Sequence, residues 1–460
     1  MEDTALNYAK THRQMFIDDL CKCLAIPSIS TLTEHKKDIN ACAKHLADHI
    51  KDIGFKTVTI NTDFGNPIIY ADYIVNKNLP TLLFYGHYDV QPIDPIELWD
   101  APPFQPTIKD DYIIARGASD NKGMVYVHLK AIESYLKTQH TLPVNVKFVI
   151  EGEEEIGSNG LFEYIKKYDQ QLSHDAMVVS DSPMFSHNQP SICTSLRGLI
   201  YLEYTIQSMH SDVHSGQLGG GVPNIIHYIA NTISKLKDPI TNKVLIPGFY
   251  NNVLPFGDFN STSDMATEHL KTLDQYYNLG THANPDLFNN IWYQPTLDCN
   301  GIESGFTEEG AKTVIPNKAL LKLSCRLVAN QDPKEISQLV QDFIASTLPK
   351  NFNITINDFN THAKPVIVDT DSPYIKKAIQ AIKDTHKKDV IIQGEGGSIP
   401  IIEAFQSQFK KPIALIGLNA PNDNIHAPNE RFHCTHYTKG IETIIRYLNA
   451  CNSHGIQTTH

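Results

Sequence analysis

Five short segments of the chain carry side chains that bind divalent metal ions, each directly after an apolar run. Between them they offer two histidines and at least three carboxylates, with a spare glutamate beside one carboxylate. Such a set suits two divalent cations and a general base, so it predicts a metal-dependent hydrolase. The segments are Gly86-His87-Tyr88-Asp89, Ser119-Asp120-Asn121-Lys122-Gly123, Glu153-Glu154-Glu155-Ile156-Gly157-Ser158, Ser180-Asp181-Ser182 and Asp423-Asn424-Ile425-His426.

The first segment pairs a histidine with an aspartate. His87 and Asp89 are two residues apart, so they share one face if the strand geometry continues. An imidazole that binds a metal normally donates its other ring N–H to a carboxylate, and we expect Asp89 to orient His87 in this way. The alternative is a buried histidine that hydrogen-bonds to a loop aspartate without a metal.

Asp120 directly precedes a predicted helix. The commonest role of an aspartate in this position is to cap the helix N-terminus. A carboxylate can also bridge two cations through its two oxygens. The segment alone leaves both interpretations open and favours the cap.

Three adjacent glutamates follow an apolar strand. Glu153, Glu154 and Glu155 repel one another, so some of them need a site that compensates their charge. If one binds a metal, its neighbour can hold the attacking water and move its proton. A solvated charge run is the usual alternative, but this run adjoins a core strand. Asp181 and His426 are further candidate ligands, although for each of them alone a structural role is the commoner one.

These segments need a sheet to position them. Apolar runs at 81–85, 146–150, 177–179 and 413–416 lack a polar face, which is typical of parallel strands covered by helices on both sides. Ligand sites in such α/β folds lie at the carboxyl ends of the strands. Helices are predicted at 4–25, 35–53, 122–137, 160–170 and 372–386, and a short strand at 112–115.

The pattern changes after residue 198. A strand with one wetter face is predicted at 199–207, then a helix at 223–236, a loop-rich stretch at 238–310, a strand at 318–328, a helix at 333–347 and a strand at 352–357. This order predicts a small α+β domain inserted into the α/β domain. We therefore expect a discontinuous catalytic domain at 1–197 and 365–460, and an inserted lid or dimerisation domain at 198–364.

Composition narrows the class of protein further. The net charge of −12 argues against nucleic acid or an anionic membrane as a partner. No apolar run reaches the roughly 18 residues of a membrane helix, and the N-terminus lacks the pattern of a signal peptide. The eight cysteines are scattered, with only Cys21 and Cys23 close together, so reduced thiols and a cytoplasmic location are expected.

Taken together and in order, the motifs resemble one known family. Gly-His-Tyr-Asp-Val, Arg-Gly-Ala-Ser-Asp-Asn-Lys-Gly, Glu-Glu-Ile-Gly-Ser and His-Ala-Pro-Asn-Glu look like those of the co-catalytic zinc peptidases. That family includes carnosinases, cytosolic nonspecific dipeptidases, carboxypeptidases, aminoacylases and succinyl-diaminopimelate desuccinylase. The resemblance covers roughly residues 15–448 and is greatest to the dipeptidase branch.

The resemblance implies a ligand set for two divalent ions per subunit. His87 and Asp181 would bind one ion, Glu155 and His426 the other, and Asp120 would bridge both. Zinc is expected, with manganese and cobalt as alternatives because carboxylate-rich sites accept several ions.

The resemblance also implies a general base and a backbone feature. In the family the base and a ligand are the two glutamates before x-Gly-Ser, which assigns the base to Glu154. The run of three leaves Glu153 as the alternative. A cis peptide bond is expected between Asp120 and Asn121.

Residues of the inserted domain complete the implied site. His214, in Asp-Val-His-Ser-Gly, would reach the active site of the opposite subunit and polarise the scissile carbonyl, which implies a homodimer formed through the inserted domains. Arg326 and the loop containing Gly397 and Ser398 would hold the substrate's carboxylate. His362 resembles a substrate-side histidine of the dipeptidase branch.

The predicted activity is metal-dependent hydrolysis of the peptide bond of dipeptides or short peptides. One alternative keeps the chemistry and changes the substrate to an N-acyl or N-succinyl amino acid. The other is a peptide-binding protein without catalysis.

Overall fold

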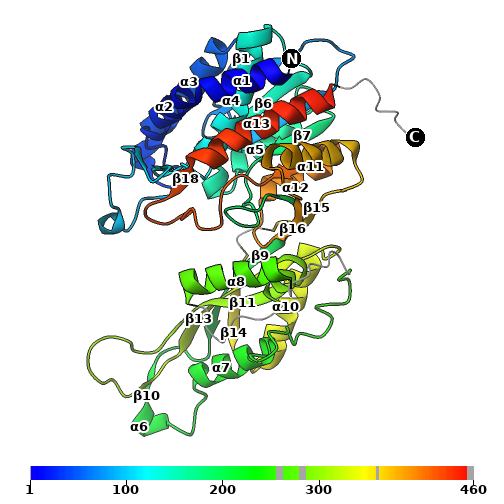
Figure 1. Ribbon diagram of the computed structural model, residues 1–460. Coiled ribbons are helices and arrows are strands. Elements are labelled where there is room, and N and C mark those ends of the chain that lie inside the picture. The colour runs from blue at the N-terminus through cyan, green and yellow to red at the C-terminus, as the bar shows by residue number, and fades with distance from the viewer. Residues whose placement is uncertain (1, 255–262, 279–285, 359–361, 453–460) are drawn as a thin grey trace. The chain divides into compact units, whose positions relative to one another are not determined.

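The computed structural model describes residues 2–254, 263–278, 286–358 and 362–452 (Figure 1). The chain divides into two compact units. The first comprises residues 1–194, 368–393 and 404–460, and the second comprises residues 195–367 and 394–403.

A nine-stranded mixed sheet has its parallel strands in the middle. There β3 runs parallel to β6 and β7, and β17 runs parallel to β7. Every residue of β7 and β17 is buried, which is why their sequences are continuous apolar runs. In spatial order the strands are β1 (Thr57–Asn61), β2 (Ile68–Tyr73), β6 (Asn145–Glu151), β3 (Thr81–His87), β7 (Ala176–Val179), β17 (Ile413–Ile416), β8 (Ser191–Leu196) and β15 (Val366–Ile367), with β16 (Ile391–Glu395) beside β8.

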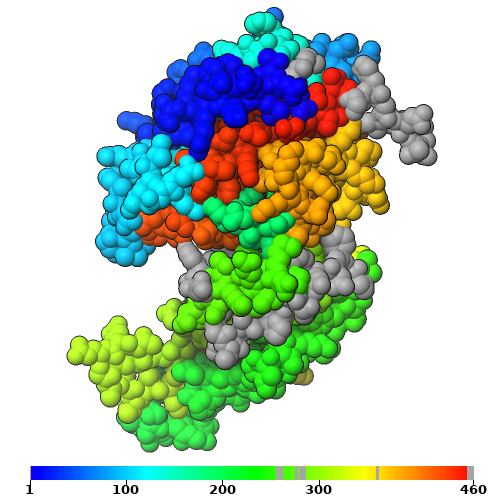
Figure 2. Space-filling view, viewed as in Figure 1, coloured from blue at the N-terminus to red at the C-terminus, as the bar shows by residue number. Residues whose placement is uncertain are grey.

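Helices cover this sheet. Helix α4 packs on β3 and also against α1 and α13, while α3 packs on β1 and β2. In the space-filling view α1 and α13 lie side by side on one surface of the first unit (Figure 2). The predicted single helix at 4–25 is two helices that meet at His12. The helices are α1 (Glu2–Thr11), α2 (Arg13–Leu24), α3 (Lys36–Asp52), α4 (Lys122–Gln139), α5 (Asn159–Lys167), α11 (Pro373–His386), α12 (Pro400–Phe409) and α13 (Cys434–Cys451).

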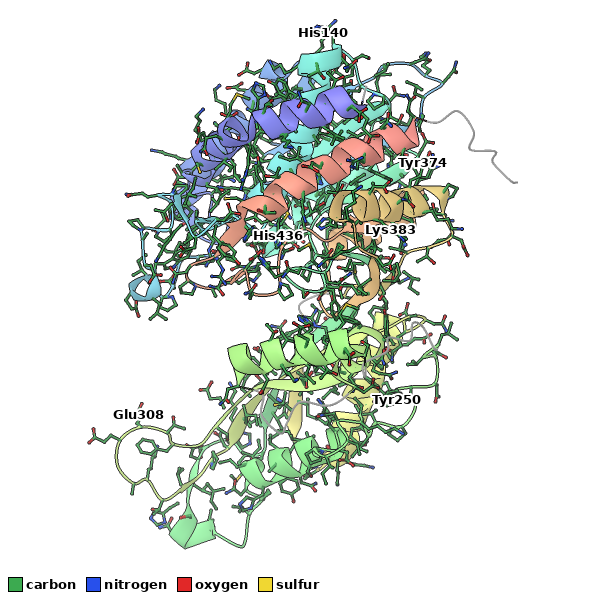
Figure 3. All side chains as sticks on the ribbon, viewed as in Figure 1. His140, Tyr250, Glu308, Tyr374, Lys383 and His436 are labelled. Carbon is green, nitrogen blue, oxygen red and sulfur yellow. The ribbon has the colours of Figure 1, made fainter. Side chains whose placement is uncertain are left out.

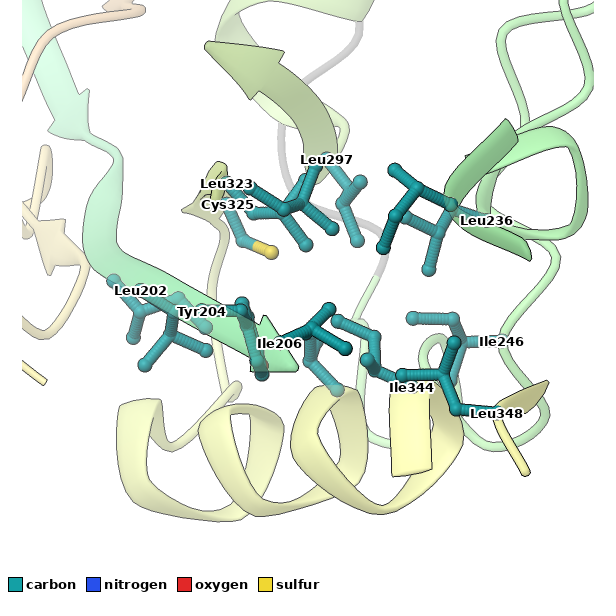
Figure 4. Packing of buried hydrophobic residues seen from close by; sticks show 14 of the residues in the cluster. Leu202, Tyr204, Ile206, Leu236, Ile246, Leu297, Leu323, Cys325, Ile344 and Leu348 are labelled. Atoms are coloured by element: carbon teal, nitrogen blue, oxygen red, sulfur yellow. The ribbon is translucent and has the colours of Figure 1, made fainter. Parts of the chain in front are cut away.

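The second unit is built on a four-stranded antiparallel sheet. Its order is β11 (Thr296–Ser304), β13 (Lys318–Leu327), β9 (Gly198–Gln207) and β14 (Asn353–Asp358). Buried and partly exposed residues alternate along β9 and β13, so one face of the sheet carries the apolar side chains. Helices α7 (Ile225–Leu236) and α10 (Pro333–Thr347) contribute to this core, in which Leu202, Tyr204, Leu323 and Ile344 are buried (Figure 4).

The prediction of a loop-rich stretch at 238–310 is wrong for much of its length. It contains α8 (Asp264–Tyr277), α9 (Leu287–Tyr293) and the strand β11. Strand β11 lies at the edge of its sheet and most of its residues are not buried, so its sequence lacks the apolar alternation of a half-buried strand.

The predicted α/β class, with a mostly parallel central sheet and an added α+β part, is confirmed. Two small sheets lie next to predicted site residues. One is formed by β4 (Thr107–Lys109), β5 (Tyr112–Ile114) and β18 (Arg431–His433), and the other by β10 (Val213–His214) and β12 (Val314–Ile315). The short helix α6 (Ser215–Leu218) follows β10. In the described ranges, no helix combines the length and apolar character needed to cross a membrane.

Candidate metal centre

Four of the five predicted segments follow parallel strands of the central sheet. His87 is the last residue of β3, and Glu155 and Asp181 follow β6 and β7. His426 follows β17, which is parallel to β7. Because parallel strands place their carboxyl ends at one edge, these four side chains gather there.

Asp120 reaches the cluster by a different route. It follows β5, which pairs with β4 and β18, so the expectation that all five segments end strands of one sheet is wrong for Asp120. The capping interpretation is also wrong, because the residue before α4 is Asn121 and no side chain caps that helix. The Asp120–Asn121 peptide bond is cis, as expected. Asn121, whose side chain was not predicted to belong to the site, donates from Nδ2 to Asp181 Oδ1 over 2.8 Å.

Two groups of potential ligands share Asp120. One contains His87, Asp120 and Asp181, the other Asp120, Glu155 and His426, and within each group the ligand atoms lie within 4.8 Å of one another. His87 Nε2 is 3.1 Å from Asp120 Oδ1, and His426 Nε2 is 2.9 Å from Asp120 Oδ2. The two oxygens of Asp120 thus face two different groups.

Several ligand atoms have unused lone pairs. The Nδ1 of His87 lies 3.1 Å from the main-chain oxygen of Asp89 and donates its proton there, so in the neutral ring Nε2 presents a lone pair. Among the described residues this buried Nε2 and the buried Oε1 of Glu155 have no hydrogen-bond partner. Unpaired buried acceptors beside other acceptors need a cation between them. Carboxylate oxygens and imidazole nitrogens are donors that zinc, manganese and cobalt accept, so the residues fit divalent metals.

The electrostatics of the cluster point the same way. Burial, together with the charge of Asp120, raises the pKa of Asp181 to about 7. Burial raises the pKa of Glu154 to about 9, with the neighbouring carboxylates adding to the effect. The hydrogen bonds to Asp120 and Glu155 raise the pKa of His426 to about 10. Without a cation, Asp181 and Glu154 therefore retain protons at a higher pH than ordinary carboxyl groups, and the negative field of the cluster attracts divalent cations.

The structure separates the three consecutive glutamates. Glu153 accepts hydrogen bonds at both oxygens, from the main-chain N–H of Asn66 (2.7 Å) and of Gly160 (2.9 Å). Its carboxylate therefore has a structural role, because it connects the backbone at Asn66 with the backbone at Gly160. The carboxylate of Asp89 accepts from the main-chain N–H of Glu154 and Glu155, over 3.2 and 3.1 Å, and so fixes the turn that carries both.

A buried carboxylate missed by the sequence analysis holds the loop of Asp120. Glu430 is fully buried, although its only sequence signal is its place in His-Ala-Pro-Asn-Glu. Its two oxygens accept hydrogen bonds from Arg116 Nη1 (2.8 Å) and from the main-chain N–H of Gly117 (2.8 Å), Ser119 (2.9 Å) and Asp120 (3.0 Å). These four donors converge on one side chain and so fix where Asp120 points.

The two predicted histidines of the second unit lie on its surface and on a loop. His214 is exposed at the end of β10, and its Nδ1 accepts from the main-chain N–H of Gly216 over 2.9 Å. Its Nε2, 3.3 Å from Thr313 Oγ1, is therefore the ring nitrogen that carries the proton in the neutral form. His362 Nε2 lies 2.9 Å from Asp358 Oδ2.

Arg326 and Ser398 are brought together within the second unit. Arg326 Nη1 donates to Ser398 Oγ over 2.9 Å, and Ser398 Oγ donates to the main-chain oxygen of Arg197. The N–H of Gly397 donates to Glu395 Oε1 over 3.1 Å. Arg197 and Glu395 were not predicted. Burial lowers the pKa of Arg197 to about 10, although the guanidinium stays charged at neutral pH.

The first unit thus contains the candidate metal ligands and also Asp89 and Glu154. The second unit contains the other predicted site residues, which are His214, Arg326, His362, Gly397 and Ser398. That these two sets act on one substrate stays a prediction.

Comparisons with known proteins agree with the fold. The profile of "Peptidase family M20/M25/M40" matches residues 83–450. The Candida albicans "Cys-Gly metallodipeptidase DUG1" is 30% identical over 94% of this chain and 94% of its own. The mouse "Beta-Ala-His dipeptidase" is 28% identical over 96% and 94%. A solved structure of an M20 family metallo-carboxypeptidase, Sso-CP2 from Sulfolobus solfataricus, superposes with a TM-score of 0.83 at 31% identity, covering 95% of this chain and 99% of that one.

The chain belongs to peptidase family M20/M25/M40. Within the family it falls in the dipeptidase branch, as the full-length relatives indicate. It is therefore a metal-dependent peptide hydrolase.

Proposed function

We propose that the protein hydrolyses dipeptides or short peptides with water activated by two divalent metal ions. The two ligand groups that share Asp120 carry this proposal, because one carboxylate common to two groups suits a pair of ions. The names of two full-length relatives, a Beta-Ala-His dipeptidase and a Cys-Gly metallodipeptidase, support dipeptides as the substrate class.

His87 and Asp181 would hold one ion, Glu155 and His426 the other, and Asp120 both. Zinc is the proposed ion, with manganese and cobalt as alternatives. When bound, the two ions lower the pKa of water and polarise the scissile carbonyl.

Glu154 is the proposed general base. Its carboxylate takes a proton from the attacking water and gives it to the leaving amine. Asp89 supports this role by holding the backbone of Glu154 and Glu155 and by orienting His87. Glu153 is a poor alternative because both of its oxygens already accept hydrogen bonds.

The second unit is proposed to bind the substrate. His214 would donate from Nε2 to the developing oxyanion, and in this proposal it comes from the partner subunit of a homodimer. Arg326, with Ser398 and Gly397, would bind the substrate's C-terminal carboxylate, because a guanidinium and a hydroxyl already lie together there. His362 is proposed to lie beside the substrate.

A cytoplasmic location is also proposed. All eight cysteines lie in the described part of the chain, and all are free. Free buried thiols are typical of a reducing compartment.

The test compares Glu154→Gln with Glu153→Gln on a panel of dipeptides, N-acetyl amino acids and N-succinyl amino acids. We expect Glu154→Gln to lower kcat by about 10²- to 10⁴-fold with the metal content unchanged, whereas Glu153→Gln keeps its turnover. Normal turnover by Glu154→Gln would show that the base is assigned wrongly. Faster turnover of N-acyl amino acids would indicate a deacylase, and metal binding without turnover of any amide would indicate a peptide-binding protein.

A further inference from the structure

The first unit contains a second cluster of titratable side chains, which shares no residue with the candidate metal centre. It lines a cavity of about 210 Å³. The side chains that matter are four histidines and two lysines, His187, His386, His433, His436, Lys388 and Lys439. They come from the loop after β7, the end of α11 and the junction of β18 with α13.

Three of the imidazole rings pack against one another. The ring centroids of His187 and His433 are 4.8 Å apart, those of His187 and His436 are 4.6 Å apart, and those of His433 and His436 are 4.9 Å apart. Rings this close cannot all carry a charge unless something neutralises them. Burial and then the neighbouring histidines lower the pKa of His436 to about 3, and burial with the two lysines lowers the pKa of His386 to about 4.

His436 supplies an unpaired atom in this cavity. The side chain lies in the first turn of α13 (Figure 3) and the residue is only 5% exposed. Its Nε2 donates to the main-chain oxygen of His187 over 2.8 Å. Its buried Nδ1 has no hydrogen-bond partner among the described residues. A buried polar atom without a partner calls for a ligand, an ion or a water.

The charges around the cavity favour an anion over a metal cation. Lys388 and Lys439 line it, and the N-terminus of the 18-residue helix α13 adds a partial positive charge. Burial is the main cause that lowers the pKa of His433, followed by the neighbouring His187, and the charges of Arg13 and Arg431 lower it further. No carboxylate is among the lining side chains.

One acidic group stands nearby, and it is already engaged. Asp111 Oδ2 lies 3.5 Å from His433 Nδ1, but the Asp111 carboxylate accepts from Arg13 Nη2 and Thr435 Oγ1, each over 2.9 Å. His433 Nδ1 itself accepts from the main-chain N–H of Thr435 over 3.1 Å. In the neutral form this leaves His433 Nε2 as an N–H donor.

We propose that this cavity is a binding site for a phosphate-type oxyanion, either inorganic phosphate or the phosphate group of a small metabolite. The two lysines and His433 Nε2–H donate to its oxygens. His436 takes up a proton at Nδ1 on binding and becomes a further donor, since the anion neutralises the charge that the packed rings otherwise repel. The site is independent of the proposed peptide hydrolysis.

Proton uptake makes binding depend on pH. The titratable groups that line the cavity with His436 are His187, His386, His433, Lys388 and Lys439. The charges of Asp111, Arg13 and Arg431 act on His433. Because the free site holds its imidazoles neutral, affinity rises as the pH falls from 8 to 6. Sulfate does not titrate in this range, so its pH response reports on the protein alone.

The experiment measures the melting temperature and the binding isotherm of the full-length metal-loaded enzyme. Sulfate, inorganic phosphate and glycerol 3-phosphate are titrated against sodium chloride at equal ionic strength, at pH 6 and pH 8. The variants are Lys388→Gln with Lys439→Gln, and His436→Gln. The matched control is Lys410→Gln with Lys411→Gln, which removes two exposed lysines that do not line the cavity.

We expect sulfate to bind the wild type and the control at pH 6 at least about tenfold more tightly than at pH 8. The Lys388 and Lys439 double variant should lose at least about tenfold in affinity, and His436→Gln should lose the pH dependence of sulfate binding. Binding of glycerol 3-phosphate at the same site would favour a metabolite's phosphate group, and binding of inorganic phosphate alone would favour the free ion. Equal responses of the wild type and the lysine double variant would overturn the proposal. So would one extra divalent metal per chain that is lost in His436→Gln without any response to the anions.

Discussion

The first unit holds two clusters of titratable groups, one rich in carboxylates and the other in imidazoles and ammonium groups. Around Asp120 carboxylates outnumber histidines, and burial raises the pKa of Asp181 to about 7. In the histidine cavity the lining offers imidazoles and ammonium groups, and burial lowers the pKa of His436 to about 3. Both clusters lie beside the first turn of an 18-residue helix, α4 or α13. The helix N-terminus therefore does not decide the ligand. The side chains around it do.

The two clusters are also held in different ways. Glu430 fixes the loop of Asp120 through four hydrogen bonds, and Asp89 fixes the turn of the glutamates. The histidines are held by ring packing, by the hydrogen bond from His436 Nε2 to the main-chain oxygen of His187, and by the one from the Thr435 N–H to His433 Nδ1. Changes in the carboxylate cluster should therefore have the larger effects.

The largest effect is expected from Asp120→Asn. This change removes the negative charge that both ligand groups share, so both metals should be lost and turnover should fall by at least about 10³-fold, more than the loss of an outer ligand partner costs. Metal analysis by mass spectrometry and a dipeptide assay measure this. Asp63→Asn, which changes an exposed aspartate of the same unit, is the control. Two metals per chain in Asp120→Asn would contradict the shared role.

Glu430→Gln is expected to act through Asp120. A glutamine amide cannot accept from four donors at once, so the loop should loosen, and metal affinity and turnover should fall by about 10- to 100-fold. Metal titration and kcat/KM report the change, with far-UV circular dichroism to monitor the fold. Glu163→Gln, at an exposed helix position, serves for comparison. Unchanged metal affinity in Glu430→Gln would show that this carboxylate supports only the fold.

Removing the metals should make stability fall as the pH rises. In the metal-free protein the pKa of Asp181 is about 7 and that of Glu154 about 9, both above the usual range of carboxyl groups near 4. Between pH 4 and these values the folded state binds more protons than the unfolded state, so raising the pH destabilises it. We expect the melting temperature of the metal-free protein to drop by several degrees between pH 6 and pH 9. A parallel drop in the metal-loaded protein would contradict this explanation.

The histidine cavity should give the smallest effect, with the opposite sign. The pKa of folded His436 lies near 3 and that of an unfolded histidine near 6.5, so stability is lost as the pH falls through 6.5. In His436→Gln, unfolding between pH 6 and pH 4 should take up about one proton fewer, so the free energy of unfolding should fall less steeply as the pH falls. Chemical denaturation in chloride buffers at several pH values measures this slope, with His210→Gln as the control. An unchanged slope would mean that His436 is protonated in the folded state.

Much of the central sheet could be predicted from the sequence because its inner strands are continuous apolar runs. His87 and Asp181 were placed correctly at strand ends for that reason. The sheet that carries Asp120 and the bonds made by Glu430 could not be predicted, because they join residues more than 300 positions apart. Local sequence patterns do not predict contacts between residues so far apart in the chain.

Strand β11 and the histidine cavity could not be predicted either, because neither has a recognisable local sequence pattern. Strand β11 has few buried residues, so its sequence looks like a loop. The four histidines of the cavity come from three distant segments, and no spacing links His187 to His386 or to His436. The catalytic and ligand roles themselves remain predictions that rest on the motifs and are consistent with the geometry.

The hydrogen bonds between Glu430 and the loop of Asp120 affect the order in which the two units can fold during synthesis. Residues 195–367 form most of the second unit as one continuous stretch, which can fold while the ribosome is still adding the rest. The first unit cannot complete its fold at that stage, because β17, His426 and Glu430 follow the second unit in the sequence. A nascent chain that has finished the second unit therefore still lacks one of its two ligand groups. By the proposed ligand set, the chain has no complete metal centre until His426 and Glu430 have been synthesised.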